Sequence, residues 1–160
     1  MDIDNKRVQI EQMQSEVNEL HPLLENILPK LPSVIRYEYT HGQYERGADF
    51  IVEIEDQATK RRKFVGLVVK LGKVGASAVT AVEEQITECN EERPYKILDR
   101  VRCNEVWVFS SGGYTERATE KIKARFSGRT VEFFGPEDIA LFVDEHYPFF
   151  WAQLPYGLGG

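Results

Sequence analysis

The chain of 160 residues contains few cysteines and histidines, and each absence limits the kinds of site it can form. Cys89 and Cys103 are its two cysteines, and they lack the spacing of a metal-binding motif. We therefore expect two structural thiols in a reducing compartment. The three histidines, His21, His41 and His146, are too scattered along the sequence to predict a metal site.

The sequence also lacks a signal peptide, a long apolar run and an excess of positive charge. Without a signal peptide or a membrane-spanning stretch, we expect a soluble, cytoplasmic protein with no membrane partner. The formal net charge is -6 at pH 7. The chain as a whole therefore does not have the basic character of a nucleic-acid binder, and any such binding must use a local patch.

The hydrophobic content of 42% predicts one globular domain with a full core. We divide the chain into N-terminal helices (residues 1–32), a core (33–148) and a tail that is aromatic and then glycine-rich (149–160). The tail either docks on the core or leads into further chain. We accordingly expect further domains or partner subunits, and a homo-oligomer.

Residues 47–70 form the most informative stretch and predict a β-hairpin. In the first strand, alternation puts Phe50, Val52 and Ile54 on one face. Residues 64–69 are apolar on both faces, which is typical of a central strand covered by helices on each side.

Two charged residues mark the ends of this hairpin, and we expect their side chains to meet at a shared cavity. Asp49 opens the first strand directly after Gly47 and Ala48, and Lys70 closes the second strand. Simpler interpretations remain open for both. Asp49 could cap a turn, and Lys70 could extend from the strand end into solvent.

Apolar periodicity predicts further helices and strands along the chain. The helices are expected at residues 4–20, 23–30, 77–92, 115–126 and 136–143, and the strands at 34–40, 105–110 and 131–134. Pro22 should break or kink the first helix, whose apolar positions are Val8, Met13, Val17 and Leu20. Strands joined through helices are parallel, whereas the hairpin is antiparallel, so a mixed sheet is predicted.

This order of elements, together with GAD at 47–49 and VVK at 68–70, resembles the PD-(D/E)xK nuclease superfamily and in particular its Mrr-like restriction-endonuclease domains. The sequence VWVFSSGGYTERATEKI resembles their buried strand, turn and helix, and VEFFGPEDIALFV resembles their final strand and helix. The resemblance covers roughly residues 34–145. It implies an α/β fold with a restriction-endonuclease-like mixed central sheet flanked by helices, in a single domain.

The resemblance implies a role for three positions. Asp49 matches the metal-binding aspartate, and Lys70 matches the lysine that orients the attacking water or offsets phosphate charge. Val68 stands where the family has a second carboxylate or a glutamine, and valine offers no side-chain oxygen to a metal such as Mg²⁺ or Mn²⁺. Restoring a glutamate at position 68 should reveal whether valine is the lesion.

Other residues could complete the site, since the family sometimes moves its acid onto a helix. Gln85 borders the buried side of its helix and could reach toward Lys70 as a further catalytic group. Glu45, in the loop before Asp49, is a candidate metal ligand, and Glu25 on an early helix is another.

Charged clusters suggest where a nucleic acid would and would not bind. We expect phosphate contacts from the basic hairpin tip and from one later lysine, namely Lys60, Arg61, Arg62, Lys63 and Lys73. A solvated hairpin tip is the simpler interpretation of the first four. An exposed acidic helix face, expected to repel the backbone, is formed by Glu83, Glu84, Glu88, Glu91 and Glu92. Gly112 and Gly113 resemble an anion-binding turn but are better explained as a strand-to-helix connection.

Two functions are consistent with these observations. The first is metal-dependent cleavage of DNA, as an effector in restriction or antiphage defence. The second is a catalytically degenerate nuclease fold, in which Val68 replaces the usual acid and the domain serves as a binding or oligomerisation module. The retained aspartate and lysine favour the first, and the negative charge and the missing acid favour the second.

Overall fold

A computed structural model describes residues 1–40 and 47–153 of the chain. The helical elements are α1 (Ile3–Glu11), the π-helical turn η1 (Glu16–Leu20), α2 (His21–Ile27), the 3-10 turn η2 (Leu28–Lys30), α3 (Val79–Cys89), α4 (Glu116–Arg125), α5 (Pro136–His146) and α6 (Phe149–Gln153). The strands are β1 (Val34–Tyr39), β2 (Phe50–Glu55), β3 (Arg62–Lys70), β4 (Arg93–Tyr95), β5 (Asp99–Val101), β6 (Glu105–Ser110) and β7 (Thr130–Phe134).

Five strands form one mixed sheet in the order β1-β2-β3-β6-β7. The hairpin strands β2 and β3 pair antiparallel, as do β1 and β2, whereas β3, β6 and β7 are parallel neighbours. The predicted mixed sheet is therefore confirmed. The parallel pairs are joined through helices, because parallel strands cannot be linked by a tight turn.

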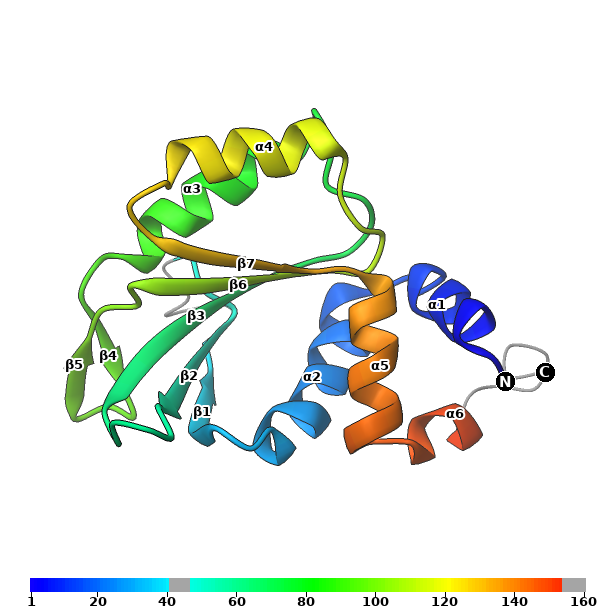
Figure 1. Cartoon of the computed structure of the whole chain (residues 1–160), viewed down its shortest axis with the longest axis horizontal. Helices are drawn as coiled ribbons and strands as arrows, with labels where there is room; N and C mark the ends of the chain where they lie inside the picture. The colour runs from blue at the N-terminus through cyan, green and yellow to red at the C-terminus, as the bar shows by residue number, and fades with distance from the viewer. Residues whose placement is uncertain (41–46, 154–160) are drawn as a thin grey trace.

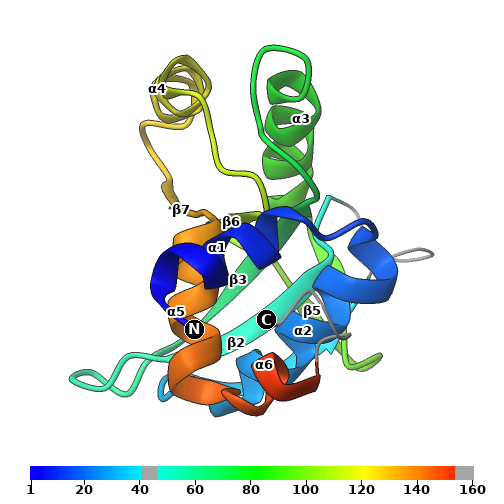
Figure 2. The ribbon, with the colours of Figure 1, turned by 90° about the vertical axis from the view of Figure 1, so that its right-hand side faces the viewer.

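Helices cover both faces of this sheet, with α3 and α4 on one side and α1, α2 and α5 on the other (Figures 1 and 2). The alternation in β2 divides its side chains between the two layers. Phe50 and Val52 pack in the layer of α2 and α5, and Ile51 packs in the layer of α3 and α4. The central position of β3 and its apolar character on both faces are thus confirmed.

The N-terminal segment differs from the single helix predicted over residues 4–20. The first helix ends at Glu11, and the Ser15 side chain caps a new π-helical turn by accepting a hydrogen bond from the Asn18 N–H at 3.0 Å. Pro22 lies in the first turn of α2, directly after the π-helical turn η1, so it follows the helix break at residues 12–15 and does not cause it.

The apolar positions assigned to that helix were also partly wrong. Val8 and Val17 are exposed, while Ile10 and Leu20 are buried with the core of α2 and β2. The predicted stripe assumed one continuous α-helical period. The interruption at residues 12–15 resets that period.

A second small sheet, for which the sequence predicted no strands, follows α3. β4 and β5 form an antiparallel pair whose strands have three residues each. Such short strands around a proline carry no readable alternation. Tyr95 anchors the pair, since its ring is buried and meets the Phe64 ring edge-on at 5.2 Å between centroids.

The acidic face predicted on α3 is corrected at one position. Glu83 is 3% exposed rather than solvated. Its two carboxylate oxygens lie 3.5 Å from the Lys121 ammonium and 3.5 Å from the Arg125 guanidinium of α4. Burial is tolerated because two cations of the neighbouring helix face the carboxylate.

The aromatic start of the tail packs on the core as α6. The Trp151 indole N–H donates to Asp144 Oδ1 at 2.8 Å, and the Lys6 ammonium contacts the same oxygen at 2.6 Å. The N-terminal helix, α5 and α6 are thereby joined. In the described part of the chain, no helix has the length and apolar character that crossing a bilayer requires.

Both cysteines are buried free thiols, and we expect them to make stability fall at alkaline pH. Burial raises the pKa of Cys89 to about 12, with a smaller contribution from the neighbouring Cys103, and raises the pKa of Cys103 to about 11, from an ordinary value of 9.0. Above pH 9 the unfolded chain therefore binds fewer protons than the folded chain. The free energy of unfolding should fall by about 1.4 kcal/mol per pH unit for each thiol.

Urea denaturation at pH 8, 9 and 10 measures this slope. A variant with Cys89→Ala and Cys103→Ala is the control for other groups that ionise in this range. Equal slopes in the two proteins would contradict the prediction.

Candidate functional site

Asp49 lies directly before β2 with its carboxylate buried between two strands. It is 2% exposed, and its Oδ2 accepts a hydrogen bond from the Val69 N–H of β3 at 2.8 Å. Its own N–H donates to the Leu67 carbonyl at 2.7 Å. The side-chain oxygen thus accepts a hydrogen bond from a main-chain N–H, as a carbonyl oxygen of a neighbouring strand would. This hydrogen bond ties Asp49 to β3.

The other carboxylate oxygen faces the N-terminal helices. Asp49 Oδ1 lies 3.9 Å from His21 Nε2, and both side chains are almost fully buried. A half-buried glutamate, Glu16, completes the group. One potential ligand atom from each of the three side chains lies within 4.8 Å of the other two.

A π-helical turn brings Glu16 and His21 together. The His21 N–H donates to the Glu16 carbonyl, five residues earlier, which is the hydrogen bond of a π-helix. Residues five apart therefore lie one turn apart here, whereas in an α-helix the turn holds 3.6 residues. This is why neither residue was selected from the sequence, where only α-helical spacings were considered.

The orientation of His21 is set from β1. Its Nδ1 lies 2.7 Å from the Tyr39 hydroxyl, and the rings of His21 and Tyr39 both pack against Phe50. A histidine that binds a metal through one nitrogen usually donates its other N–H to such a partner. With Nδ1 directed to Tyr39, Nε2 is the nitrogen that faces Asp49.

This group fits a divalent metal ion in donor chemistry. Two carboxylates and one imidazole suit Mn²⁺, while Mg²⁺ prefers oxygen ligands throughout. Ligands about 2.1 Å from such an ion lie about 3–4 Å from one another. The three side chains would thus need to close by only about 1 Å around an ion. Glu16, His21 and Asp49 are the residues that would hold it.

The two other positions implied by the family resemblance, Val68 and Lys70, lie near the end of the neighbouring strand β3. Val68 is fully buried in the apolar layer of α3 and α4, and Lys70 follows it two residues later on the same strand. Alternation therefore directs Lys70 to the face of Val68. Lys70 is half-buried and makes no ion pair with any residue in the described ranges 1–40 and 47–153. Its meeting with Asp49 at the end of the strands remains a prediction.

Gln85 contacts the turn that precedes Asp49. Its side-chain amide donates to the Gly47 carbonyl at 3.1 Å, so it supports this turn from α3, and a contact with Lys70 stays a prediction. Glu45 lies outside the described residues. Glu25 is half-buried on α2. Among the described residues, it does not belong to the group of Glu16, His21 and Asp49.

The residues predicted to contact phosphate lie at opposite ends of β3. Lys60, Arg61, Arg62 and Lys63 lie at or beside the hairpin tip, about 26 Å along the strand from Lys70. Arg62 contacts Glu53 at 3.2 Å, and Lys63 contacts Glu105 at 2.8 Å. Lys73 is exposed and lies just after β3, at the end where Lys70 lies.

The turn at Gly112 and Gly113 serves as a connection. Ser110 Oγ accepts hydrogen bonds from the Gly112 and Gly113 N–H groups at 3.2 and 3.0 Å. The same hydroxyl donates to the Gly72 carbonyl at 2.6 Å. These N–H groups are therefore satisfied within the protein, as the simpler interpretation of this turn predicts.

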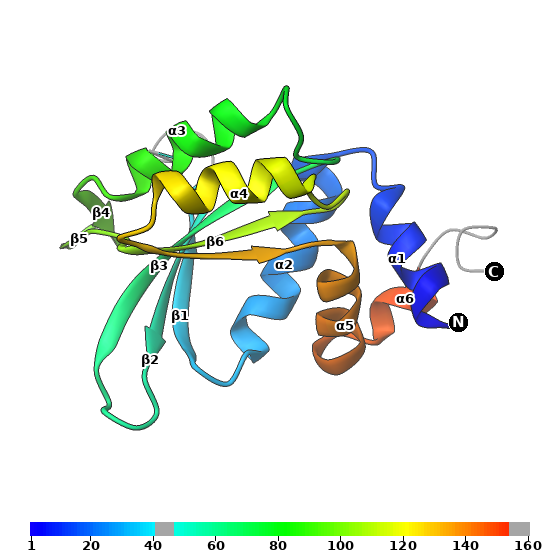
Figure 3. The same ribbon diagram turned by 45° about the horizontal axis from the view of Figure 1, so that its top comes forward.

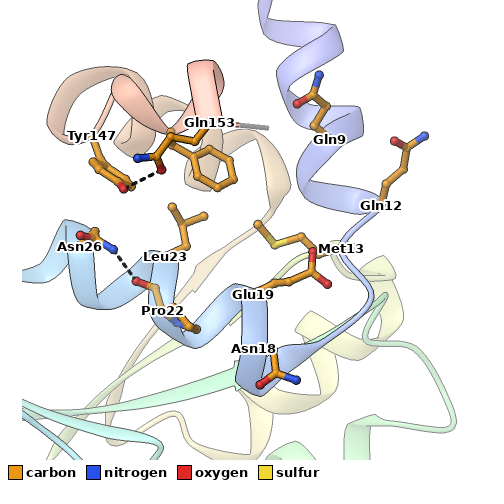
Figure 4. A pocket seen from close by; sticks show the side chains of 11 residues that line it. Gln9, Gln12, Met13, Asn18, Glu19, Pro22, Leu23, Asn26, Tyr147 and Gln153 are labelled. Atoms are coloured by element: carbon orange, nitrogen blue, oxygen red, sulfur yellow. Dashed lines mark hydrogen bonds between the residues drawn. The ribbon is translucent and has the colours of Figure 1, made fainter. Parts of the chain in front are cut away.

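A separate cavity of about 310 Å³ lies between α1, η1, α2 and α6 (Figure 4). Leu23 and Met13 form part of its apolar wall, and Gln9, Gln12 and Gln153 bring side-chain amides to its rim. Glu19 lines this cavity, although it shares η1 with Glu16. The candidate metal ligands do not line it, so the cavity is not part of the site around Asp49.

Comparisons with known proteins support the architecture. No protein-family model and no curated protein sequence matches the chain. The structure is similar to the DNA modification-dependent restriction endonuclease AspBHI, with a TM-score of 0.57 and 16% identity over 89% of this chain. A weaker likeness is to the MspJI restriction endonuclease in complex with a 27-mer oligonucleotide, with a TM-score of 0.43 and 13% identity over 80% of this chain.

The chain corresponds to 35% of the AspBHI chain and 28% of the MspJI chain. At this level of identity the first similarity concerns the fold alone. The predicted restriction-endonuclease-like fold, a single domain with a mixed central sheet flanked by helices, is confirmed.

Proposed function

We propose that this restriction-endonuclease-like fold cleaves DNA phosphodiester bonds with a divalent metal ion held by Glu16, His21 and Asp49. The observation that carries the proposal is the convergence of these three side chains at the end of the β2–β3 pair, where two of them are buried. Carboxylates and an imidazole that converge in this way supply oxygen and nitrogen donors of the kind that divalent metal ions bind. We further propose that the domain is an Mrr-like member of the PD-(D/E)xK superfamily and an effector in restriction or antiphage defence.

Each residue of the proposed site has a defined task. A divalent ion held by Glu16, His21 and Asp49 would polarise a phosphodiester oxygen and lower the pKa of a water. The Val69 N–H holds Asp49 in place and the Tyr39 hydroxyl holds His21, so both donors are oriented by partners within the protein. Lys70 would offset the charge that develops on the phosphate from the same end of the sheet.

A degenerate domain is the second candidate, and Val68 is the observation that favours it. The family position of the second acid is occupied by a fully buried valine that packs between the sheet and the helices α3 and α4. In this case the fold would bind a partner or oligomerise, and the polar group around Asp49 would only connect β2 to α2.

Plasmid cleavage and metal binding together test the proposal. We expect cleavage with Mg²⁺ or Mn²⁺ that falls at least about 100-fold in Asp49→Asn and Glu16→Gln, since loss of groups that merely orient ligands costs about 10–100-fold in metal affinity or activity. Calorimetry should show tighter binding of Mn²⁺ than of Mg²⁺, because the set contains an imidazole. Lys70→Met should lower cleavage while metal binding is retained.

Glu84→Gln is the matched control, because Glu84 is an exposed acid on α3. Its cleavage and metal binding should equal those of the wild type. Absence of cleavage and of metal binding in the folded wild-type protein would favour the degenerate domain.

A further inference from the structure

The tip of the β4–β5 hairpin carries the most exposed large apolar side chains of the described chain. Ile97 is 91% exposed and Leu98 is 90% exposed, whereas the next, Phe149, is 63% exposed. Figures 1 and 3 show this hairpin projecting from the end of the molecule, beside the five-stranded sheet. Two adjacent aliphatic residues at a protruding tip are unfavourable in water and suggest a contact.

The hairpin is held firmly, so the exposure of its tip does not result from a loose loop. The Lys96 N–H donates to the Glu38 carboxylate of β1 at 2.7 Å. At the base, the buried Arg93 guanidinium donates to the Glu88 carbonyl at 2.5 Å, and Tyr95 packs on Phe64. These contacts hold the base of the hairpin and the backbone of Lys96, next to Ile97 and Leu98.

The backbone of the tip is strained. Lys96 has φ 52° and Ile97 has φ 71°, in the left-handed region that a β-branched residue rarely adopts. Such a conformation costs roughly 1–2 kcal/mol per residue, and it persists where the surroundings enforce it, most often at functional segments. Strain and exposure thus coincide at Ile97.

We propose that Ile97 and Leu98 form a wedge that enters a base step of duplex DNA, an inference that rests on the proposed function. Apolar side chains inserted between base pairs partly unstack them and kink the duplex. Two side chains are too small a surface for a stable protein interface, which buries about 800 Å² per partner. They match the size of a single base step.

The charges around the tip are suited to phosphates. Lys96 is exposed beside Ile97. Arg100 and Arg102 are exposed and contact one shared carboxylate, Glu92, at 3.1 and 3.9 Å. Two guanidinium groups facing one carboxylate leave positive charge beside the wedge, and the acid next to Leu98, Asp99, lies 3.7 Å from the Arg36 guanidinium. A duplex could therefore be held there by local contacts.

β1 connects the wedge to the candidate metal site. Glu38, which accepts from Lys96, lies opposite Ile51 of β2, two residues after Asp49. The next residue, Tyr39, contacts His21. DNA distorted at the hairpin tip would thus lie next to the strand that orients His21, one of the proposed metal ligands.

Binding to duplexes that carry 2-aminopurine at a flexible pyrimidine–purine step tests the wedge. Ca²⁺ replaces Mg²⁺ and Mn²⁺ so that the DNA stays uncut. We expect the wild-type protein to increase 2-aminopurine fluorescence, because an unstacked base is less quenched. In the double variant Ile97→Ala and Leu98→Ala, the increase should disappear and binding should weaken about tenfold. The double variant Leu141→Ala and Phe149→Ala removes exposed apolar surface from α5 and α6 and should behave as wild type.

Three results would overturn the wedge. The first two concern the wedge alone, and the third also concerns the proposed function. Unchanged fluorescence and affinity in the hairpin variant, with cleavage intact, would reject the wedge alone. Self-association that depends on Ile97 and Leu98 while DNA binding does not would identify a protein contact. Absence of DNA binding by every protein would reject both proposals.

Discussion

Val68→Glu is expected to destabilise the protein strongly and to leave any nuclease activity unimproved. Val68 is fully buried in the apolar layer of α3 and α4, with Ile51 and Val106 among its neighbours in that cluster. A carboxylate introduced there would lie on the face of the sheet away from His21. An unpaired buried charge costs about 3–5 kcal/mol, which is a large part of the stability of a typical domain.

Urea denaturation of the variant at pH 7 and pH 5 measures this effect. Part of the stability should return at pH 5, because the introduced carboxyl group has a raised pKa in an apolar site and becomes neutral. Val68→Met is the control that adds volume without charge, and it should cost about 1–3 kcal/mol from overpacking at both pH values. A stable Val68→Glu protein with increased cleavage would instead show that the valine is a catalytic lesion.

Gly47→Ala is expected to have an effect of similar size at the other side of the site. Gly47 has φ 85°, and an added Cβ would lie 2.3 Å from the Gln85 carbonyl oxygen and 2.7 Å from Glu88 Cβ. Helix α3 thus passes too close to the chain for any side chain. The left-handed backbone costs roughly 1–2 kcal/mol for alanine, and the overlap with helix backbone adds about 1–3 kcal/mol.

Gly72→Ala is a matched control for this substitution. Gly72 has φ 84°, but an added Cβ there meets nothing within 4 Å. It should lose only the part of the stability that comes from the backbone conformation. Thermal or urea denaturation of the two variants separates strain from overlap. Equal losses in both would show that α3 does not restrict the turn before Asp49.

The short-range pattern of the sequence was sufficient for the central part of the fold. The alternation of Phe50, Val52 and Ile54 correctly placed these residues on one face, and the apolar run at 64–69 correctly indicated a strand covered on both sides. The strand predicted at 105–110 has the same bounds as β6. In each case the period of two belongs to the strand itself, so it can be read without knowledge of its neighbours.

The candidate site was predictable only in part. Asp49 stands out because it is an acid at the start of an apolar strand. Glu16 and His21 carry no such mark, because their proximity depends on a π-helical turn and on the packing of α2 against β2. Lys70, Gln85 and Val68 could be named from the sequence, but the sequence does not say which face of the sheet each would occupy relative to Asp49.

The sequence by itself therefore determined the order along the chain of the strands of the main sheet, its mixed character and the burial of β2 and β3, since these follow from local hydrophobic periodicity. The tertiary structure alone decided which polar groups share a site. It placed Glu83 against Lys121, gathered Glu16 and His21 around Asp49, and left Ile97 and Leu98 in solvent. Such contacts join residues far apart along the chain, and their distances are set by how helices pack on the sheet, which no local pattern encodes.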